Sequence, residues 1–527
     1  MKNILFLIGI LFLLSCKKRE DTPKAEPTSI TPAPTATSNF TSDQKYNLNV
    51  VYFVPSDLDT IANYEKRVSE LLLMGQKFYH DEMTRNGYPG KTFGLLTNNK
   101  NRVKIITIRG TKLKSQYPRE GGSAAIVAEI NAYFAANPSD QNGQHTLILL
   151  PPYGYNADGS PIDGPFYGIG KWCYAMDYEG LELKYIGTSK FTKWYGGMMH
   201  ELGHGLNLPH NCAKVSETPS LGTALMGAGN YTLSVSKTFL TATDCAILNS
   251  NEIFNKDTKT YYGSVTASIK TINASYDATK SAIVISGEFI SSATVKNIIY
   301  YNDPNVNSEG MGANKDYNAV SYESKPVGTN GFSTSFLLSD LQYKGNTPYE
   351  LRIGLVNENG TVSTFSYLYK FENDIPVLDF STRTEINKQG WSISEVSSEE
   401  TSGEGTINGK ASKLIDNDLS TYWHSRWSGT AATYPHQITI DMGNVKLVEG
   451  ISLSQRNTLS RSVKSFEYLT SSNGIDFVSA GNFELANSTS IQYFKLPNKQ
   501  SLRYIKIIAK SAYDGSNFAA LAEIGAF

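Results

Sequence analysis

Residues 200–210 read His-Glu-Leu-Gly-His-Gly-Leu-Asn-Leu-Pro-His, and this stretch decides the fold of the N-terminal part of the chain. Three of the seven histidines of the 527-residue chain fall within it. Apolar residues at helical spacing predict a helix over residues 190–204. Positions i and i+4 of a helix share a face, so this helix would turn the imidazoles of His200 and His204 toward one ion.

His210 cannot join this pair if the helix continues, because its position would fall on another face. The chain must therefore turn sharply after His204, and Asn207 is the expected hinge because Asn tolerates a left-handed backbone. Three imidazoles leave the fourth position of a zinc ion open to water, as in catalytic sites. Glu201 follows the first ligand and is suited to act as the general base toward that water.

This block resembles the metzincin zinc peptidases, whose signature is His-Glu-x-x-His-x-x-Gly-x-x-His followed by a Met-turn. The resemblance implies that His200, His204 and His210 bind zinc and that Glu201 is the catalytic base. Asn207 stands where most of that family has Gly. A class of zinc peptidases that takes a downstream Glu as third ligand is the alternative.

The same resemblance covers residues beyond the histidines. Residues 223–227, Thr-Ala-Leu-Met-Gly, match the Met-turn and would place Met226 beneath the metal. Residues 166–176 would form the edge strand that pairs with a peptide substrate. Tyr231 is a candidate for stabilising an oxyanion. In the downstream-Glu alternative, the third ligand would be Glu217 or Glu252.

The chain around the motif alternates between strand and helix patterns, which favours an α/β domain over residues 44–262. Strands are expected at 47–54, 102–108 and 146–150, and helices at 58–85 and 124–136. After residue 263 the helical pattern disappears. Short β-type runs over 263–372 predict an immunoglobulin-like sandwich. The fold class is therefore multidomain, with a second all-β module over 373–527.

An apolar run over residues 4–14 has the length of a signal-peptide core and is too short to span a bilayer. It ends Leu13-Leu14-Ser15-Cys16, which resembles the lipobox of bacterial lipoproteins. The resemblance implies that residues 1–15 are a signal peptide and that a lipid on Cys16 anchors the protein in the bacterial outer membrane, facing either the cell surface or the periplasm. An ordinary signal peptide with a chance Cys is the alternative. Residues 16–43, rich in Pro, Thr and Ser, are expected to be a disordered tether.

Composition narrows the range of functions. Lys plus Arg number 48 against 49 for Asp plus Glu, and the net charge of -1 offers no basic surface for nucleic acid. Three cysteines remain after Cys16. In an oxidising envelope we expect a Cys212–Cys245 disulfide, with Cys173–Cys212 as the alternative. A monomer is expected.

The final module resembles discoidin or coagulation-factor-type C domains, which include galactose-binding-like carbohydrate modules. The resemblance rests on Leu-Ile-Asp-Asn-Asp over 414–418 with Thr-Tyr-Trp-His over 421–424, and on Ala-Glu-Ile over 522–524. It implies a possible Ca²⁺ site made of Asp416, Asp418, Thr421 and Glu523, residues whose hard oxygen ligands suit that ion. It also implies a possible sugar site, for which His424, Trp427, Arg456 and Asn457 have suitable chemistry, while Trp423 is expected in the core.

Two functions from different classes follow. The first is a surface-anchored zinc endopeptidase whose C-terminal module directs it to a protein or glycoprotein substrate. The second is a non-catalytic glycan-binding or adhesin lipoprotein with a vestigial peptidase domain. The intact Glu201 favours the enzyme, because a relic that only binds needs no base beside its metal ligands.

Overall fold

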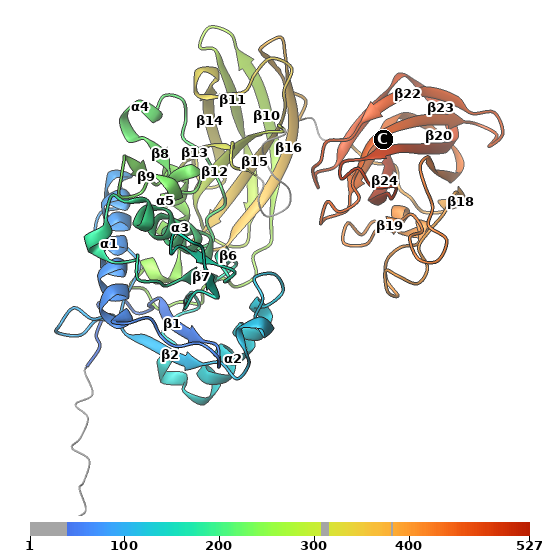
Figure 1. The fold of residues 1–527 in the computed structure, drawn as a ribbon. Helices are drawn as coiled ribbons and strands as arrows, with labels where there is room; N and C mark the ends of the chain where they lie inside the picture. Colours follow the sequence, from blue (N-terminus) through green and yellow to red (C-terminus); the bar gives the residue numbers. More distant parts are fainter. Residues whose placement is uncertain (1–38, 307–315, 381–382) are drawn as a thin grey trace, which may run out of the picture. The chain divides into compact units, whose positions relative to one another are not determined.

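The computed structural model describes residues 39–306, 316–380 and 383–527, and Figure 1 shows the chain as a ribbon. The expected signal peptide, Cys16 and most of the expected tether lie outside these residues. In the described ranges, no helix combines the length and apolar character that crossing a membrane requires.

The N-terminal domain is built on a five-stranded sheet of order β2-β1-β3-β7-β6. The first four strands run parallel, and β6 is antiparallel to β7 at one edge. The single edge strand expected over 166–176 is therefore wrong, because a turn with Gly170 at φ 60° folds the segment into the β6–β7 hairpin. The strands are β1 (Asn49–Val54), β2 (Ile105–Arg109), β3 (Thr146–Leu150), β6 (Tyr167–Ile169) and β7 (Trp172–Met176).

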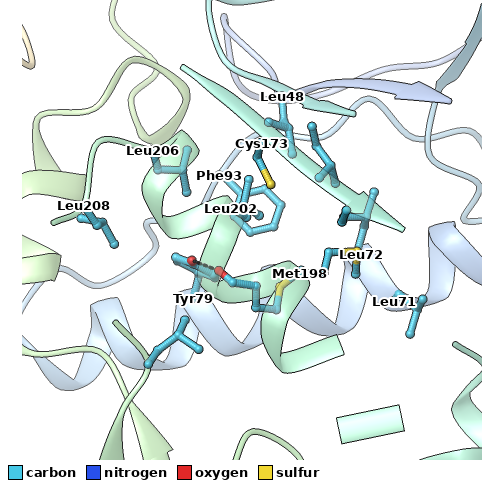
Figure 2. Close-up of a cluster of buried hydrophobic side chains, with 14 of the residues drawn as sticks. Leu48, Leu71, Leu72, Tyr79, Phe93, Cys173, Met198, Leu202, Leu206 and Leu208 are labelled. Carbon is cyan, nitrogen blue, oxygen red and sulfur yellow. Dashed lines mark hydrogen bonds between the residues drawn. The ribbon is translucent and has the colours of Figure 1, made fainter. Parts of the chain in front are cut away.

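Helices cover both faces of this sheet. Helix α2 (Ser123–Ala136) packs one apolar cluster against one face. Helices α1 (Tyr64–Arg85) and α3 (Ser189–Gly205) share the larger cluster, part of which is drawn in Figure 2. In that cluster the Tyr79 hydroxyl of α1 donates to the Met199 carbonyl of α3 at 3.1 Å. The shorter elements are β4 (Gly154–Tyr155), β5 (Pro161–Ile162), α4 (Thr218–Leu221), β8 (Thr223–Ala224), β9 (Thr238–Phe239), α5 (Ala242–Asn249) and the 3₁₀ turns η1 (Lys114–Gln116), η2 (Pro138–Asp140), η3 (Leu183–Tyr185), η4 (Ala228–Tyr231) and η5 (Glu252–Phe254).

The middle domain is a sandwich of two antiparallel sheets, as the alternating pattern predicts. Its apolar side chains meet in one core between the sheets. The last strand of the five-stranded sheet lies beyond residue 372, so the domain extends past the expected boundary. One sheet contains β10 (Ala267–Asp277), β11 (Ala282–Ser291) and β14 (Gly331–Leu337); the other contains β13 (Val320–Ser324), β12 (Val295–Pro304), β15 (Pro348–Asn357), β16 (Val362–Glu372) and β17 (Ile375–Val377), with η7 (Leu338–Asp340) between β14 and β15.

The middle domain shares a core with the N-terminal domain. Ile299, Tyr301, Ala319 and Val356 of the sandwich belong to the same buried cluster as α1 and α3. The backbone N–H of Cys212 donates to the Ala319 carbonyl at 2.9 Å, just after the histidine motif. Continuous packing of this kind links the histidine segment to the sandwich.

The C-terminal residues form a third unit, an all-β fold with a core of its own around Trp423, which is fully buried as expected. Strand β20 is bent by register shifts and pairs with β18, β23 and β24. The strands are β18 (Ser392–Val396), β19 (Trp423–His424), β20 (His436–Gln455), β21 (Val463–Ser471), β22 (Val478–Glu484), β23 (Gln492–Ala512) and β24 (Ala520–Ala526), with η8 (Ala411–Ile415) before β19.

The disulfide expectation is wrong. Cys173 and Cys245 are free thiols, so neither Cys212–Cys245 nor Cys173–Cys212 is formed. Cys245 lies in the N-terminal core, where it accepts from the Asn86 amide at 3.3 Å. Cys212 instead packs against the core of the middle sandwich. Cys212 and Cys245 do not pair because their side chains face different cores.

Candidate active site

Helix α3 and the turn that ends it place three histidines together. His200 and His204 lie on the last turns of α3, and Asn207 adopts φ 70°, the left-handed conformation expected of the hinge. The Leu208 N–H then donates to the Gly203 carbonyl at 3.0 Å, which closes the helix and returns the chain toward it. His210 therefore comes to face the other two imidazoles.

The three imidazoles converge through one nitrogen each. The Nε2 atom of His204 lies 3.2 Å from that of His200 and 2.9 Å from that of His210. The Nδ1 atoms of His200 and His204 contact the Leu225 and Leu208 carbonyls at 2.7 and 2.8 Å. A carbonyl accepts only from a protonated nitrogen, so these contacts leave the lone pair on Nε2 in both neutral rings.

This donor set fits a divalent metal. Burial, and to a lesser extent the neighbouring His204, lowers the pKa of His200 to about 3, so the His200 ring is neutral. The lone pairs of neutral imidazoles repel one another unless a cation lies between them. Candidate ligand atoms of the three histidines all lie within 4.8 Å of one another. Nitrogen ligands about 2.0–2.1 Å from zinc in a tetrahedral site are separated by a little over 3 Å, close to the distances between the Nε2 atoms.

Met226 packs against the helix that carries the first two histidines. Its side chain is fully buried. A Cβ atom at Gly203 would lie only 2.4 Å from the Met226 sulfur, so the sulfur packs directly on α3. The Asn211 N–H donates to the Met226 carbonyl at 3.3 Å, which connects the expected Met-turn to the residue after His210. A position for Met226 beneath a metal stays a prediction.

Glu201 is held by the edge strand of the sheet. Its Oε2 atom accepts from the Gly168 N–H of β6 at 2.7 Å. A Cβ atom at Gly168 would lie 2.4 Å from both the Glu201 carbonyl oxygen and the His204 Cβ, so only glycine permits this approach. Burial raises the pKa of the Glu201 carboxyl to about 7, against the lowering effects of the Gly168 bond and the charge of Arg119.

The downstream-Glu alternative does not fit this arrangement. Glu217 bonds to the backbone and ammonium groups of Lys214, both at 3.1 Å. Glu252 is buried and accepts from the Gln144 N–H at 2.7 Å. Among the described residues, the group that could hold a metal ion consists of the three histidines. Neither glutamate belongs to it.

An open pocket of about 500 Å³ follows the carboxyl ends of β2 and β3. The Tyr153 hydroxyl there is buried and has no hydrogen-bond partner in the described part of the chain. Arg119, which lines this pocket, is one of the groups that lower the pKa of Glu201. The lining residues are Lys114, Ser115, Pro118, Arg119, Glu120, Tyr153 and Asp163.

In the C-terminal domain, the residues expected to bind calcium have partners within the protein. The buried Glu523 carboxylate forms an ion pair with Lys388. Asp416 pairs with Lys413 at 3.2 Å, and Asp418 accepts from Ser420. The Thr421 hydroxyl donates to Asp416 at 2.9 Å. Within the residues that the structure describes, these carboxylates are not among the His, Cys, Asp and Glu groups close enough to hold a metal ion by side chains alone, and the calcium site stays a prediction.

The expected sugar-binding residues are better grouped. Trp427 is 41 % exposed, and its indole N–H donates to Glu404 at 2.9 Å. The same carboxylate accepts from the Tyr422 hydroxyl at 2.5 Å and lies 3.9 Å from His424 Nε2. Arg456 stacks on the Tyr422 ring with 3.9 Å to the centroid, and Asn457 is exposed beside it. His424 is buried, so only its ring edge can reach a ligand.

Comparison with solved structures identifies the first two domains. The wild-type OgpA structure from Akkermansia muciniphila is 36 % identical, with a TM-score of 0.59, over 62 % of this chain and 94 % of OgpA. This chain belongs to the OgpA family. A catalytically inactive OgpA, solved in complex with an O-glycopeptide substrate, is 34 % identical over 64 % of this chain and 96 % of OgpA, again with a TM-score of 0.59.

A different relative matches only part of its own length. A sialidase from Micromonospora viridifaciens is 34 % identical over 187 residues, which are 34 % of this chain and 26 % of the sialidase. The F5/8 type C domain model matches residues 393–524. Residues 393–524 of the C-terminal unit are therefore an F5/8 type C domain.

Sequence reasoning missed two residues, one at the histidine site and one in the F5/8 type C domain. Tyr317 of the middle domain stacks on His210 with ring centroids 3.8 Å apart. Glu404 organises the exposed aromatic group of the F5/8 type C domain. Neither residue belongs to a motif, so no local signal marks them. The expected oxyanion residue, Tyr231, lies in η4 and is 61 % exposed.

Proposed function

We propose that this protein is a zinc-dependent endopeptidase that cleaves O-glycosylated proteins. The observation that carries the proposal is the bond from the Gly168 amide to Glu201, which fixes a half-buried carboxylate on the helix that carries two of the three converging imidazoles. OgpA supports the substrate class, because its inactive form was solved with an O-glycopeptide substrate. A vestigial domain would have no need of this arrangement.

Each part of the site has a separate role in the proposed reaction. His200, His204 and His210 would hold zinc, which when bound supplies Lewis acidity and lowers the pKa of water. A peptide added to the β6 edge of the sheet would lie along the segment that holds Glu201. Glu201 accepts the proton of the attacking water and returns it to the nitrogen of the departing amine.

The pocket lined by Arg119 and Tyr153 suits the sugar of such a substrate. Its two basic residues, Lys114 and Arg119, are balanced by Glu120 and Asp163. Donors, carboxylate acceptors and the unpartnered Tyr153 hydroxyl match the hydroxyl groups of a neutral glycan. A glycan held here would fix the position of the peptide relative to Glu201.

The F5/8 type C domain would bind a second glycan. Trp427 offers an exposed aromatic face and donates to Glu404, an acceptor. Arg456, a donor, stacks on Tyr422, whose hydroxyl bonds to the same Glu404. We further propose that the mature protein is a monomer anchored by a lipid on Cys16 in the bacterial outer membrane. Such an anchor would bring the peptidase to glycoproteins at the cell envelope.

The test compares an O-glycosylated peptide with the same peptide lacking sugars, using protein that begins at residue 17. We expect zinc-dependent cleavage of the glycosylated form, detected by mass spectrometry, and little cleavage of the bare peptide. Chelation should abolish activity and added zinc should restore it. Glu201→Gln should keep the metal and reduce kcat by about 10²–10⁴-fold, the usual contribution of a general base.

His210→Ala is the matched metal control, because it should lose most of the bound zinc while Glu201→Gln retains it. Metal content is measured by mass spectrometry of the purified proteins. Cleavage of both peptides at equal rates would remove glycan recognition from the proposal. Cleavage by Glu201→Gln at the wild-type rate would contradict the mechanism.

A further inference from the structure

Tyr317 brings the middle domain into the histidine site. Its ring stacks on His210, with centroids 3.8 Å apart and planes 26° from parallel. It is also nearly parallel to the His200 ring, at 7° and 6.5 Å. The side chain is 37 % exposed, so one edge of the ring stays open to solvent beside the ligands. The tyrosine therefore combines contact with a proposed metal ligand and access to solvent.

A backbone hydrogen bond and an ion pair fix the loop that carries Tyr317. Asp316 adopts φ 81°, and its carbonyl accepts from the Ala319 N–H at 2.9 Å. The half-buried Arg352 of β15 donates to the Asp316 carboxylate at 2.7 Å and lies 3.9 Å from Asp303. A charge-assisted bond at this length fixes the backbone conformation that presents the tyrosine.

A second connection fixes the loop relative to the ligands. The Cys212 N–H, two residues after His210, donates to the Ala319 carbonyl, two residues after Tyr317. Tyr317 and His210 are thus tied to each other both through their rings and through their backbones. Stacking alone would explain a structural residue, but it does not explain why a tyrosine with an open edge is held there.

We infer that Tyr317 is a catalytic residue of the proposed peptidase reaction, donating a hydrogen bond to the oxygen of the scissile carbonyl. This inference rests on the proposed function. As the water oxygen bonds to the carbonyl carbon, the π electron pair moves onto the carbonyl oxygen and the proton of the water moves to Glu201. The Tyr317 hydroxyl keeps its own proton and stabilises the negative charge.

One other tyrosine competes for this role. Tyr231 in η4 follows the Met-turn and is 61 % exposed, so its hydroxyl is also open to a substrate. A phenol keeps its proton at neutral pH because its ordinary pKa is about 10, so either hydroxyl is able to donate.

The experiment uses Tyr317→Phe, which keeps the ring on His210 and removes only the hydroxyl. We expect kcat on the glycopeptide to fall by about 10²–10³-fold, the usual cost of one oxyanion donor, with KM nearly unchanged. Affinity for a phosphinic peptide, which mimics the tetrahedral intermediate, should fall by a similar factor. Zinc affinity and glycopeptide binding by the metal-free protein should stay at wild-type values.

Two further variants keep the inference open to contradiction. Tyr276→Phe in β10 removes a hydroxyl from the other sheet of the same domain and should behave as wild type. Tyr231→Phe tests the competing donor. Wild-type kcat in Tyr317→Phe, or the whole loss appearing in Tyr231→Phe, would overturn the inference. A zinc affinity that falls with kcat would reduce Tyr317 to a positioning residue. An inactive wild-type protein would contradict the proposed function instead.

Discussion

At the scale of single residues, backbone carbonyls determine what the buried histidines can do. The Nδ1 atoms of His200 and His204 contact the Leu225 and Leu208 carbonyls, which leaves Nε2 of each ring available to bind a metal. His145 uses both ring nitrogens within the fold: Nδ1 contacts the carbonyl of Gly205 at 2.7 Å, and Nε2 contacts the Tyr262 hydroxyl at 2.6 Å. Its neutral ring supports the end of α3 rather than binding a ligand.

His145 should therefore make the fold sensitive to acid. Burial lowers the pKa of His145 to about 4, whereas an unfolded histidine has a pKa of about 6.5. Between these values the unfolded chain carries a proton that the folded chain does not, so stability is lost as the pH falls below about 6.5. The loss is about 1.4 kcal/mol per pH unit, or about 3 kcal/mol between pH 6.5 and 4.5.

Urea unfolding of metal-free protein, followed by proteolysis of unfolded chains, measures this effect at pH 7 and pH 4.5. His145→Gln removes the titrating group while leaving the other histidines in place. We expect the wild-type protein to lose about 2 to 3 kcal/mol more than the variant over this interval. An equal loss in both proteins would show that His145 does not control the acid sensitivity.

At the scale of elements, the contact between β6 and α3 is the geometric basis of the site. Gly168→Ala should separate them, because the new Cβ would lie 2.4 Å from the Glu201 carbonyl oxygen. The general base would then move by a fraction of an ångström to an ångström and lose its amide donor. We expect kcat to fall by about 10²-fold, the typical cost of such a displacement, while the circular dichroism spectrum stays unchanged.

Gly263→Ala is the matched control, since its new Cβ would find no atom nearer than 3.9 Å. It should keep wild-type activity and stability. A fully active Gly168→Ala would show that β6 and α3 can separate without disturbing Glu201, and that the bond from the amide is dispensable.

The elements also show where sequence reasoning succeeds. The spacing of His200, His204 and Asn207 predicts α3 and its left-handed end, because both depend on local backbone geometry. Contacts between distant segments leave no such pattern. Tyr317 lies more than a hundred residues after His210 in the chain, and the turn at Gly170 divides an apolar run that reads as one strand.

The wrong disulfide has the same origin. The expectation rests on cysteines pairing in an oxidising envelope, but a bond also requires the two side chains to face one another. Cys212 and Cys245 face different cores. The calcium site stays a prediction; Lys388 forms an ion pair with the buried Glu523 carboxylate there, a contact that no sequence pattern marks.

At the scale of the whole molecule, the three domains do not contribute equally to catalysis. The middle sandwich shares a buried core with the N-terminal domain and carries Tyr317. The F5/8 type C domain has a core of its own around Trp423. We therefore expect the first two domains to act as the proposed catalytic unit, and the third to act as a separate binding module.

Removing residues 383–527 tests this division. Since the proposed metal ligands, Glu201 and Tyr317 all precede the deletion, we expect kcat/KM on a short O-glycopeptide to stay within about twofold of the full chain. Cleavage of a large, multiply glycosylated protein should fall at least about tenfold at low substrate concentration, because binding through a second site raises the effective concentration of substrate at the cleft. Trp427→Ala in the full chain should reproduce the effect on the large substrate alone, with product formation followed by electrophoresis. If the deletion slows both substrates equally, the F5/8 type C domain supports the catalytic unit instead, and its exposed tryptophan has no part in substrate capture.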